Sequence, residues 1–241
     1  MSSIPIFRDS FRDSFASRAE AGKQLAAAIV AELTQLRTEC RGDPSAIASA
    51  KPIVYALPRG GLPVAYPIAE QLQCPLDIVV AKKITTVFNP ELAIGALTPD
   101  GEIVWGHQEM GSSIYNGRIR EKDVHHAQAK AEAQLAQLSK FRPHVSPEGK
   151  IAILVDDGIA TGMTMAVAAK AMQAQKPAQV WIAVPVAPLQ LMSSLEEWCD
   201  RAIVLATPDP FISVSRFYVD FPQVDLSEAQ AYLEKYNQRQ F

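Results

Sequence analysis

Residues 151–164 read Ile-Ala-Ile-Leu-Val-Asp-Asp-Gly-Ile-Ala-Thr-Gly-Met-Thr, and this segment changes character twice. Its first five residues are apolar and rich in β-branched side chains, which predicts a strand buried on both faces of a parallel sheet. The carboxylates of Asp156 and Asp157 follow at the expected end of that strand. Small residues come next, and residues 165–172 are strongly helix-forming. The segment therefore predicts a strand, an acidic pair, a tight loop and the start of a helix.

A loop of this kind can bind a sugar phosphate. Free N–H groups and the positive end of the helix dipole attract phosphate, while the carboxylates can accept hydrogen bonds from ribose hydroxyls or hold a divalent cation. The chain has neither the Gly-Lys-Ser/Thr of a Walker loop nor a GxGxxG motif, so nucleoside triphosphate and dinucleotide sites lack their usual support. We expect a ribose 5-phosphate site; an ordinary buried strand with a polar turn is the alternative.

The same run resembles the phosphoribosyl diphosphate (PRPP) binding motif of type I phosphoribosyltransferases, in which two acids and two variable residues precede Ala/Thr-Thr-Gly-x-Thr/Ser. The resemblance implies that Asp156 and Asp157 are catalytic and bind the ribose hydroxyls or Mg²⁺. It assigns the 5-phosphate to the loop residues Gly158, Ala160, Thr161, Gly162, Met163 and Thr164. It also implies an α/β fold, with a parallel-sheet, Rossmann-like core, a small hood and a mobile hairpin lid.

A second apolar strand is predicted at residues 53–57, and Pro58-Arg-Gly-Gly-Leu-Pro63 follows it. Adjacent glycines let the backbone approach a ligand closely and expose successive N–H groups, and Arg59 supplies a permanent fork of donors. A plain strand-to-helix turn would have the same pattern. The resemblance assigns Arg59, Gly60 and Gly61 to the pyrophosphate of PRPP, in a loop where family members often have a non-proline cis peptide.

Two lysines, Lys82 and Lys83, follow a third predicted strand at residues 76–81. Adjacent lysines at a strand end are usually solvated. In the resembled family, however, a basic residue at this place helps to bind pyrophosphate. The resemblance favours Lys83 for that role, with Lys82 as the alternative, and it makes Arg59 and Lys83 the catalytic residues that hold the leaving group.

The segment that follows is expected to form the lid. Apolar runs at 92–97 and 103–105 surround Thr98-Pro-Asp-Gly101, which predicts a hairpin. In type I enzymes a closing lid occupies this place in the chain. Asn-Pro-Glu-Leu-Ala-Ile-Gly-Ala, residues 89–96, resembles more narrowly a set of uncharacterised bacterial phosphoribosyltransferase-like proteins. Residues 112–141 are charged and alanine-rich, which predicts a long, largely exposed helix with a thin apolar stripe.

Strands at 180–186 and 202–205 with a helix at 189–199 continue the alternation, which predicts a parallel sheet with right-handed crossovers. We therefore place the core at 49–206, with the lid and helical insertion at 84–142.

The segments 1–48 and 207–241 remain to build the hood. The spacing of apolar residues, including Phe7, Phe11 and Phe15, predicts a helix over much of 10–38. In the aromatic tail, candidates for stacking on the acceptor base are Phe217, Tyr218 and Phe221, with core packing as an equal alternative, and Asp220 could accept from an exocyclic amine. Ser227 is a plausible N-cap for a final helix.

Composition narrows the class of protein. The chain has 241 residues, of which 48% are hydrophobic and 20% charged, as in globular proteins, and its net charge of −3 offers no footprint for nucleic acid. Three scattered cysteines lack metal-ligand spacing and argue for free thiols in a reducing compartment. No apolar run is long enough to span a membrane, and charges stand where a signal peptide needs its apolar stretch. We expect a cytoplasmic protein without nucleic-acid or membrane partners.

The resemblance implies a pentosyltransferase of nucleotide metabolism, which transfers phosphoribosyl from Mg²⁺-PRPP to a nitrogenous base or amine and releases pyrophosphate. Family habit implies a homodimer. Ala160 stands where 6-oxopurine enzymes have a third acid, which disfavours hypoxanthine and guanine and leaves the acceptor open. Two alternatives remain: a PRPP-sensing regulator that has lost catalysis, and a sugar-phosphate hydrolase.

Overall fold

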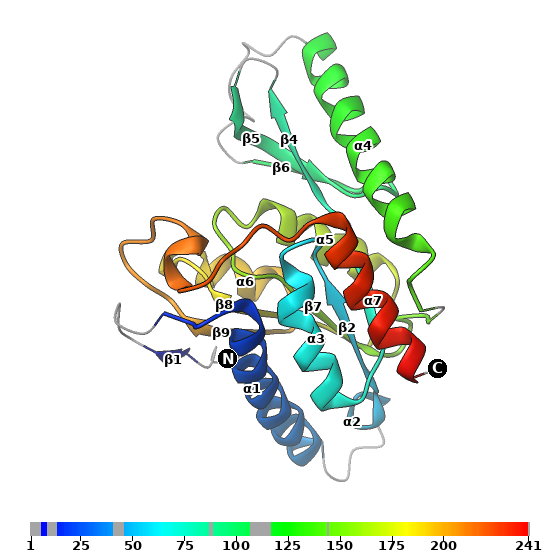
Figure 1. Ribbon diagram of the computed structural model, residues 1–241, viewed down its shortest axis with the longest axis vertical. Coiled ribbons are helices and arrows are strands. Elements are labelled where there is room, and N and C mark those ends of the chain that lie inside the picture. Colours follow the sequence, from blue (N-terminus) through cyan, green and yellow to red (C-terminus); the bar gives the residue numbers. More distant parts are fainter. Residues whose placement is uncertain are drawn as a thin grey trace.

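The central element of the computed structural model is a sheet of six parallel strands in the order β1-β9-β8-β7-β2-β3 (Figure 1). The structure describes residues 6–8, 14–40, 46–86, 89–106, 117–143 and 145–240. The predicted parallel α/β fold is confirmed. The strands are β1 (Ile6–Arg8), β2 (Pro52–Ala56), β3 (Leu76–Ile78), β7 (Ile151–Val155), β8 (Gln179–Val186) and β9 (Arg201–Ala206).

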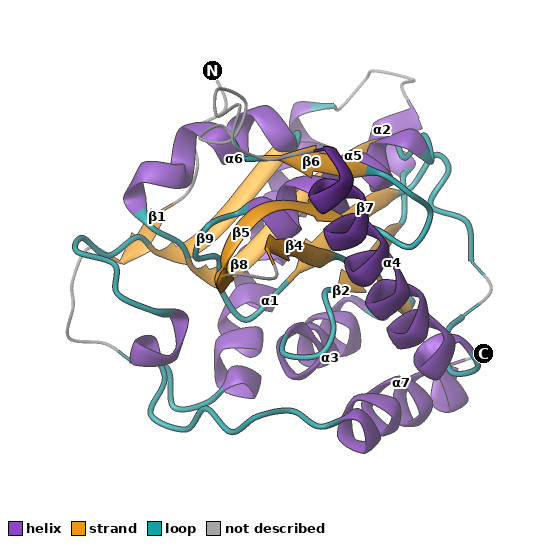
Figure 2. Ribbon diagram, turned by 90° about the horizontal axis from the view of Figure 1, so that it is seen from above, coloured by secondary structure: helices purple, strands orange, loops and turns teal. Residues whose placement is uncertain are grey.

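Helices cover both faces of this sheet (Figure 2). Strand β7 lies between β2 and β8, and all five of its residues are buried. Its side chains alternate between two hydrophobic cores: Ile153 lies in one and Leu154 in the other. The first core includes residues of α1 (Arg18–Glu39), α3 (Gly61–Leu72) and α7 (Leu226–Gln240), and the second includes residues of α5 (Met163–Ala174) and α6 (Met192–Trp198). The short helix α2 is Ala46–Ser49.

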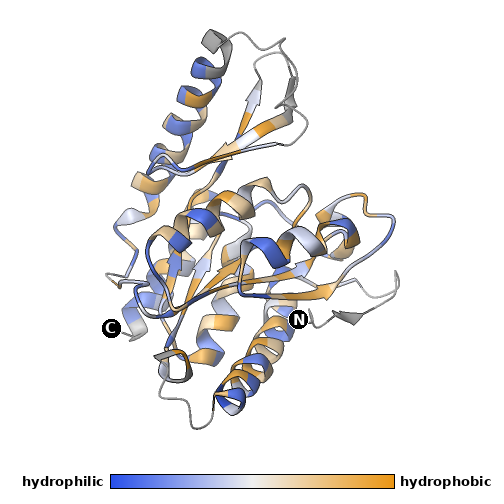
Figure 3. Ribbon diagram, turned by 180° about the vertical axis from the view of Figure 1, so that it is seen from behind, coloured by the Kyte–Doolittle hydropathy of each residue, from blue (hydrophilic) through white to orange (hydrophobic). Residues whose placement is uncertain are grey.

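The predicted lid is a separate antiparallel sheet with strand order β4-β5-β6. Its strands are β4 (Lys82–Thr86), β5 (Asn89–Leu97) and β6 (Ile103–Trp105), and the helix α4 (Gly117–Ser139) follows them. This unit projects from the central sheet (Figure 1), and α4 carries mostly hydrophilic residues interrupted by hydrophobic ones (Figure 3). The hairpin of β5 and β6 is confirmed. Strand β4 was not predicted, because its sequence, Lys-Lys-Ile-Thr-Thr, lacks a regular alternation of polar and apolar residues. In the structure, two register shifts interrupt its pairing with β5.

The two ends of the chain lie side by side. Phe15 N–H donates to the carbonyl of Phe217 (2.8 Å), and Val219 N–H donates to the carbonyl of Phe15 (2.9 Å). The helix predicted over much of 10–38 is α1, which begins at Arg18 with Ser17 as its N-cap. Phe15, which the predicted spacing included, lies before the helix and pairs in an extended segment. The side chains of Phe7 and Phe11 lie outside the described residues.

The final helix also starts differently from the prediction. Asp225 Oδ1 accepts hydrogen bonds from Glu228 N–H (2.8 Å) and from the Ser227 hydroxyl (2.7 Å). The N-cap of α7 is therefore Asp225 and not Ser227, because the carboxylate precedes the first helical residue and reaches the free N–H groups of the first turn. In the described part of the chain, no helix is both long and apolar enough to cross a membrane.

Candidate functional site

The acidic pair lies at the carboxyl end of β7, against the glycine loop that follows β2. The two strands pair in parallel, and Leu57 N–H donates to the carbonyl of Val155 (2.8 Å). A Cβ atom on Gly60 would lie 2.2 Å from Asp157 Oδ2, and one on Gly61 would lie 2.6 Å from the Val155 carbonyl oxygen. Only glycine fits at these places. The structure thus brings the two predicted motifs together, and the peptide bond Pro58–Arg59 is cis.

Arg18, at the start of α1, binds the second acid of the pair. Its Nε donates to Asp157 Oδ2 (2.8 Å), and its Nη1 donates to the carbonyl oxygen of Pro222 (2.7 Å). The guanidinium lies 3.6 Å from the ring centroid of Phe221. The hydroxyl of Tyr218 donates to the main-chain carbonyl of Asp157 (2.6 Å). Sequence analysis missed Arg18, because a single arginine in a charged N-terminal segment carries no motif.

Burial dominates the electrostatics of the acidic pair. Burial raises the pKa of Asp156 well above its ordinary value, and the charge of Asp157 raises it further. Burial also raises the pKa of Asp157, although the hydrogen bond from Arg18 works in the opposite direction. Asp156 Oδ1 accepts the N–H of Asp157 at 2.8 Å. Two close carboxylates in this environment favour a ligand that donates hydrogen bonds or carries positive charge.

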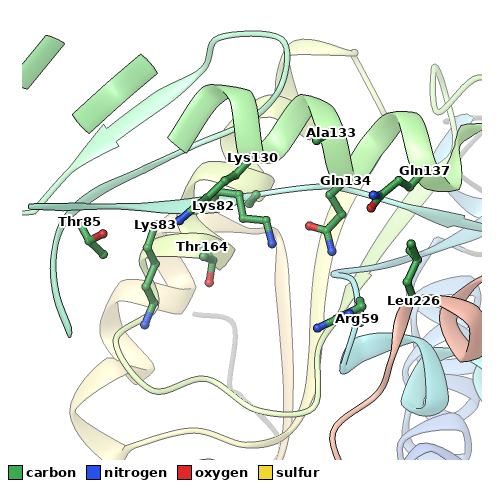
Figure 4. A pocket seen from close by; sticks show the side chains of 11 residues that line it. Arg59, Lys82, Lys83, Thr85, Lys130, Ala133, Gln134, Gln137, Thr164 and Leu226 are labelled. Carbon is green, nitrogen blue, oxygen red and sulfur yellow. The ribbon is translucent and has the colours of Figure 1, made fainter. Parts of the chain in front are cut away.

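A cavity of about 680 Å³ lies between the core and the lid (Figure 4). Thr164 from the start of α5 and Arg59 from the glycine loop line it together with Lys82 and Lys83, which are the first residues of β4 rather than the end of a core strand. Burial lowers the pKa of Lys82, and the charges of Arg59 and Lys130 lower it further. The complete described lining is Arg59, Ala81, Lys82, Lys83, Thr85, Lys130, Ala133, Gln134, Gln137, Thr164 and Leu226, none of which is acidic.

A second hollow of about 460 Å³ adjoins the first and reaches Asp157 of the acidic pair. The two share Arg59, Lys82 and Gln134. Asp157 and Arg18 lie in the second hollow only. Its described lining is Arg18, Pro58, Arg59, Gly60, Lys82, Gln134, Asp157, Phe221, Gln223 and Val224. Arg59, Gly60 and Lys82, which were predicted to bind pyrophosphate, therefore line the same hollow as Asp157, whereas Asp156 lines none of the described hollows.

The loop between the acids and α5 turns sharply. Gly162 has φ +78°, and a Cβ on it would lie 2.6 Å from the ring of Trp198, so both conformation and space require glycine. Gly158 packs against Val214, where a Cβ would lie 2.7 Å from a methyl group. Ala160 and Thr161 are exposed. Met163 and Thr164, the first two residues of α5, are both half-buried.

The three aromatic candidates for base binding differ in their surroundings, although the rings of Tyr218 and Phe221 are in contact, with 4.9 Å between centroids. Phe217 is buried and stacks on Phe211 with 5.5 Å between ring centroids. Tyr218 is also buried, since its segment pairs with Phe15. Among the three, only Phe221 lines a described hollow. The tail folds back on the N-terminal segment, so core packing accounts for the other two rings.

Metal binding rests on the donor set of the acidic pair. Within the described residues, no cluster of three or more Asp, Glu, His or Cys side chains is placed to hold a metal ion. Asp156 and Asp157 alone supply two carboxylates. Mg²⁺ is commonly bound through one or two carboxylates plus substrate phosphates and water. The pair therefore fits an ion that arrives with a phosphorylated substrate.

Comparisons with known proteins agree on the family. The family model described as "Phosphoribosyl transferase domain" matches residues 22–221. The Mycobacterium tuberculosis (strain H37Rv) protein named "Putative phosphoribosyl transferase Rv0571c" is 33% identical over 225 residues, which cover 92% of this chain and 46% of that protein, so the chain spans about half the length of this relative. The crystal structure of TT1426 from Thermus thermophilus matches with a TM-score of 0.71 at 28% identity, covering 92% of this chain and 99% of that one. Since the family model spans most of the sequence, this chain belongs to the phosphoribosyl transferase domain family.

Proposed function

We propose that this chain is a phosphoribosyltransferase that uses Mg²⁺-PRPP and releases pyrophosphate. One observation carries the proposal: Thr164 of the 5-phosphate motif lines the same cavity as Arg59 and Lys83, the residues expected at the pyrophosphate. A substrate with a phosphate at one end and a diphosphate at the other needs anion-binding groups at both ends of one cavity. Asp157 in the adjoining hollow, with Asp156 next to it in the chain, suits the ribose hydroxyls between the two ends.

Each group has a role in this proposal. The loop from Gly158 to Thr164 binds the 5-phosphate through main-chain N–H groups and threonine hydroxyls at the start of α5. Asp156 and Asp157 accept hydrogen bonds from the ribose hydroxyls and would hold Mg²⁺, which when bound neutralises charge on the diphosphate. Gly60 and Gly61 let the backbone come close, while Arg59, with Lys83 or Lys82, holds the departing pyrophosphate.

Catalysis then depends on position and charge. Displacement of pyrophosphate at ribose C1 by a nitrogen nucleophile passes through a state with oxocarbenium character, in which negative charge grows on the leaving group. Preorganised cations at that group lower the barrier, because they act without reorganisation in a partly enclosed site. The acceptor would approach from the hollow beside Asp157, which Phe221 also lines.

The decisive experiment follows pyrophosphate release from Mg²⁺-PRPP with a panel of bases and amines. Release that requires one acceptor supports the transferase. Release at the same rate without any acceptor indicates a sugar-phosphate hydrolase, and saturable binding without release indicates a PRPP-sensing regulator. Sedimentation of the same sample tests the homodimer, which stays a prediction.

A matched pair of variants tests the site itself. Asp157→Asn keeps the shape of the side chain but removes its charge, so we expect Mg²⁺-PRPP to bind at least about 10-fold more weakly, as for loss of a charge-assisted hydrogen bond. Glu148→Gln removes an exposed charge ahead of β7, at the opposite end of that strand, and should leave binding unchanged. Equal affinities of the two variants for Mg²⁺-PRPP would contradict the assignment.

A further inference from the structure

The lid helix α4 contributes three polar side chains to the cavity, Lys130, Gln134 and Gln137. Figure 4 shows Lys130 and Gln134 extending from α4 toward the hollow that Lys82 and Arg59 face from the other elements. Gln134 lines both hollows, and its Nε2 lies 3.5 Å from the carbonyl oxygen of Pro58 in the glycine loop. The lid helix therefore meets the core at the proposed diphosphate site.

Four cations from three parts of the chain share this cavity. Arg59 comes from the core loop, Lys82 and Lys83 come from β4, and Lys130 comes from α4. Among the described residues, no acid forms a salt bridge with any of the four. Because these like charges line one cavity, they repel one another. The direction of the Lys82 pKa agrees: burial lowers it, and the charges of Arg59 and Lys130 lower it further. An anion placed among them would relieve that repulsion.

Lys130 differs from Lys122, the other lysine of α4, and from Lys140, which follows the end of the helix. Lys122 and Lys140 are exposed, as Lys130 is, but neither lines this cavity. Lys140 instead lies over the ring of Phe141, 4.5 Å from its centroid. Ala127 and Ala131, on the side of α4 that packs on the β4-β5 hairpin, are buried and hold this turn of the helix in place. Lys130, in the same turn, therefore lies at the cavity. Lys122 is therefore a suitable control for a general loss of charge on α4.

We propose that Lys130 is a further phosphate-binding residue, which reaches from α4 to the diphosphate that Arg59 binds from the core. The diphosphate then joins the lid helix to the core loop, and the cations that repel one another share a polyanionic ligand. This inference rests on the proposed function, because it takes the ligand of the cavity to be PRPP. It adds a residue outside the two sequence motifs and gives α4 a direct part in binding.

Calorimetric titration of three ligands tests the inference: Mg²⁺-PRPP, Mg²⁺-pyrophosphate and ribose 5-phosphate. Lys130→Gln should weaken binding of the two diphosphate ligands about 10-fold, the loss expected for one charge-assisted hydrogen bond. Ribose 5-phosphate lacks the diphosphate, so its affinity should not change. Lys130→Arg should restore most of the affinity for pyrophosphate, and Lys122→Gln should behave as the unmodified protein.

Two outcomes overturn the inference. One is a Lys130→Gln variant that binds Mg²⁺-pyrophosphate as tightly as Lys122→Gln does. The other is an equal loss for ribose 5-phosphate, which would indicate a general change in the site. If the unmodified protein binds Mg²⁺-pyrophosphate but not Mg²⁺-PRPP, the proposed function fails while the comparison of Lys130→Gln with Lys122→Gln on pyrophosphate still decides the role of Lys130.

Discussion

Gly60→Ala tests whether the glycine loop is glycine-rich because of the acidic pair. Gly60 has φ −61° and ψ −28°, a conformation that alanine adopts without strain, so any cost of the substitution comes from space. The new Cβ would lie 2.2 Å from Asp157 Oδ2 and 2.9 Å from its Cγ. The same Oδ2 accepts the hydrogen bond from Arg18. The carboxylate must therefore move, and its ion pair with Arg18 must lengthen or break.

The loss of stability in Gly60→Ala has two parts: the steric overlap of the new methyl group and the loss of the ion pair between Arg18 and Asp157. Overpacking a dense site costs about 1–3 kcal/mol, and losing a hydrogen bond between charged groups costs about 1.5–3 kcal/mol. Both side chains of the ion pair are largely buried, at 9% exposure for Arg18 and 16% for Asp157, so solvent screens the loss only slightly. We expect a decrease of about 2.5–6 kcal/mol in the free energy of unfolding, which for a chain of this size lowers the Tm by about 5–24 °C.

A double-mutant cycle separates the collision from other causes. Asp157→Ala removes the atoms that the new methyl group meets, so Gly60→Ala should cost much less in that background, with a coupling free energy of about 1–3 kcal/mol by urea denaturation. Gly149→Ala is the control: φ is +67° there and the added Cβ meets nothing within 4 Å, so it should lower stability by only about 1–2 kcal/mol and leave Mg²⁺-PRPP binding intact.

The reasoning is refuted if Gly60→Ala and Asp157→Ala add without coupling, since the two positions then do not meet in the folded protein. A Gly60→Ala variant with unchanged Tm and unchanged Mg²⁺-PRPP affinity would refute it as well.

Two further predictions concern the charges around the acidic pair. Because burial raises the pKa of Asp156 in the folded protein, its contribution to stability is present below the unfolded pKa and is lost as the pH rises through the folded pKa. Asp156→Asn should therefore reduce the loss of stability with rising pH. A gain of about 1 kcal/mol in the free energy of unfolding at neutral pH would raise the Tm by about 2–4 °C, while Mg²⁺-PRPP binding weakens. A lower Tm at neutral pH would contradict this prediction. Arg18→Gln leaves the Asp157 carboxylate without its cation and should lower the free energy of unfolding by about 3–5 kcal/mol, measured by denaturation. Lys23→Gln, which breaks the exposed pair with Glu20, is the control and should cost under about 1 kcal/mol. Similar losses in the two variants would exclude a special role for Arg18.

Much of this protein follows from local sequence alone. The apolar run of β7, the two acids after it and the small residues before α5 lie within one short segment, so the strand, turn and helix could be predicted from neighbouring residues. The same holds for β2 and the glycine loop. A buried parallel strand needs a continuous apolar run, and the start of a helix leaves N–H groups without partners inside the helix; both effects act over a few residues.

Only the tertiary structure decided which distant residues contact these two motifs. Arg18 is far from Asp157 in sequence, and they meet only because the first helix packs on the sheet and the C-terminal tail returns to hold the guanidinium at Pro222. Lys130 reaches the cavity through the packing of α4 on the lid, which no local pattern encodes. The sequence does not distinguish a charged or aromatic side chain that lines the site from one that is solvated, because long-range packing decides which residues it contacts. Local periodicity therefore determined the framework and the loop between β7 and α5, and the folded chain alone determined which charges face each other within that framework.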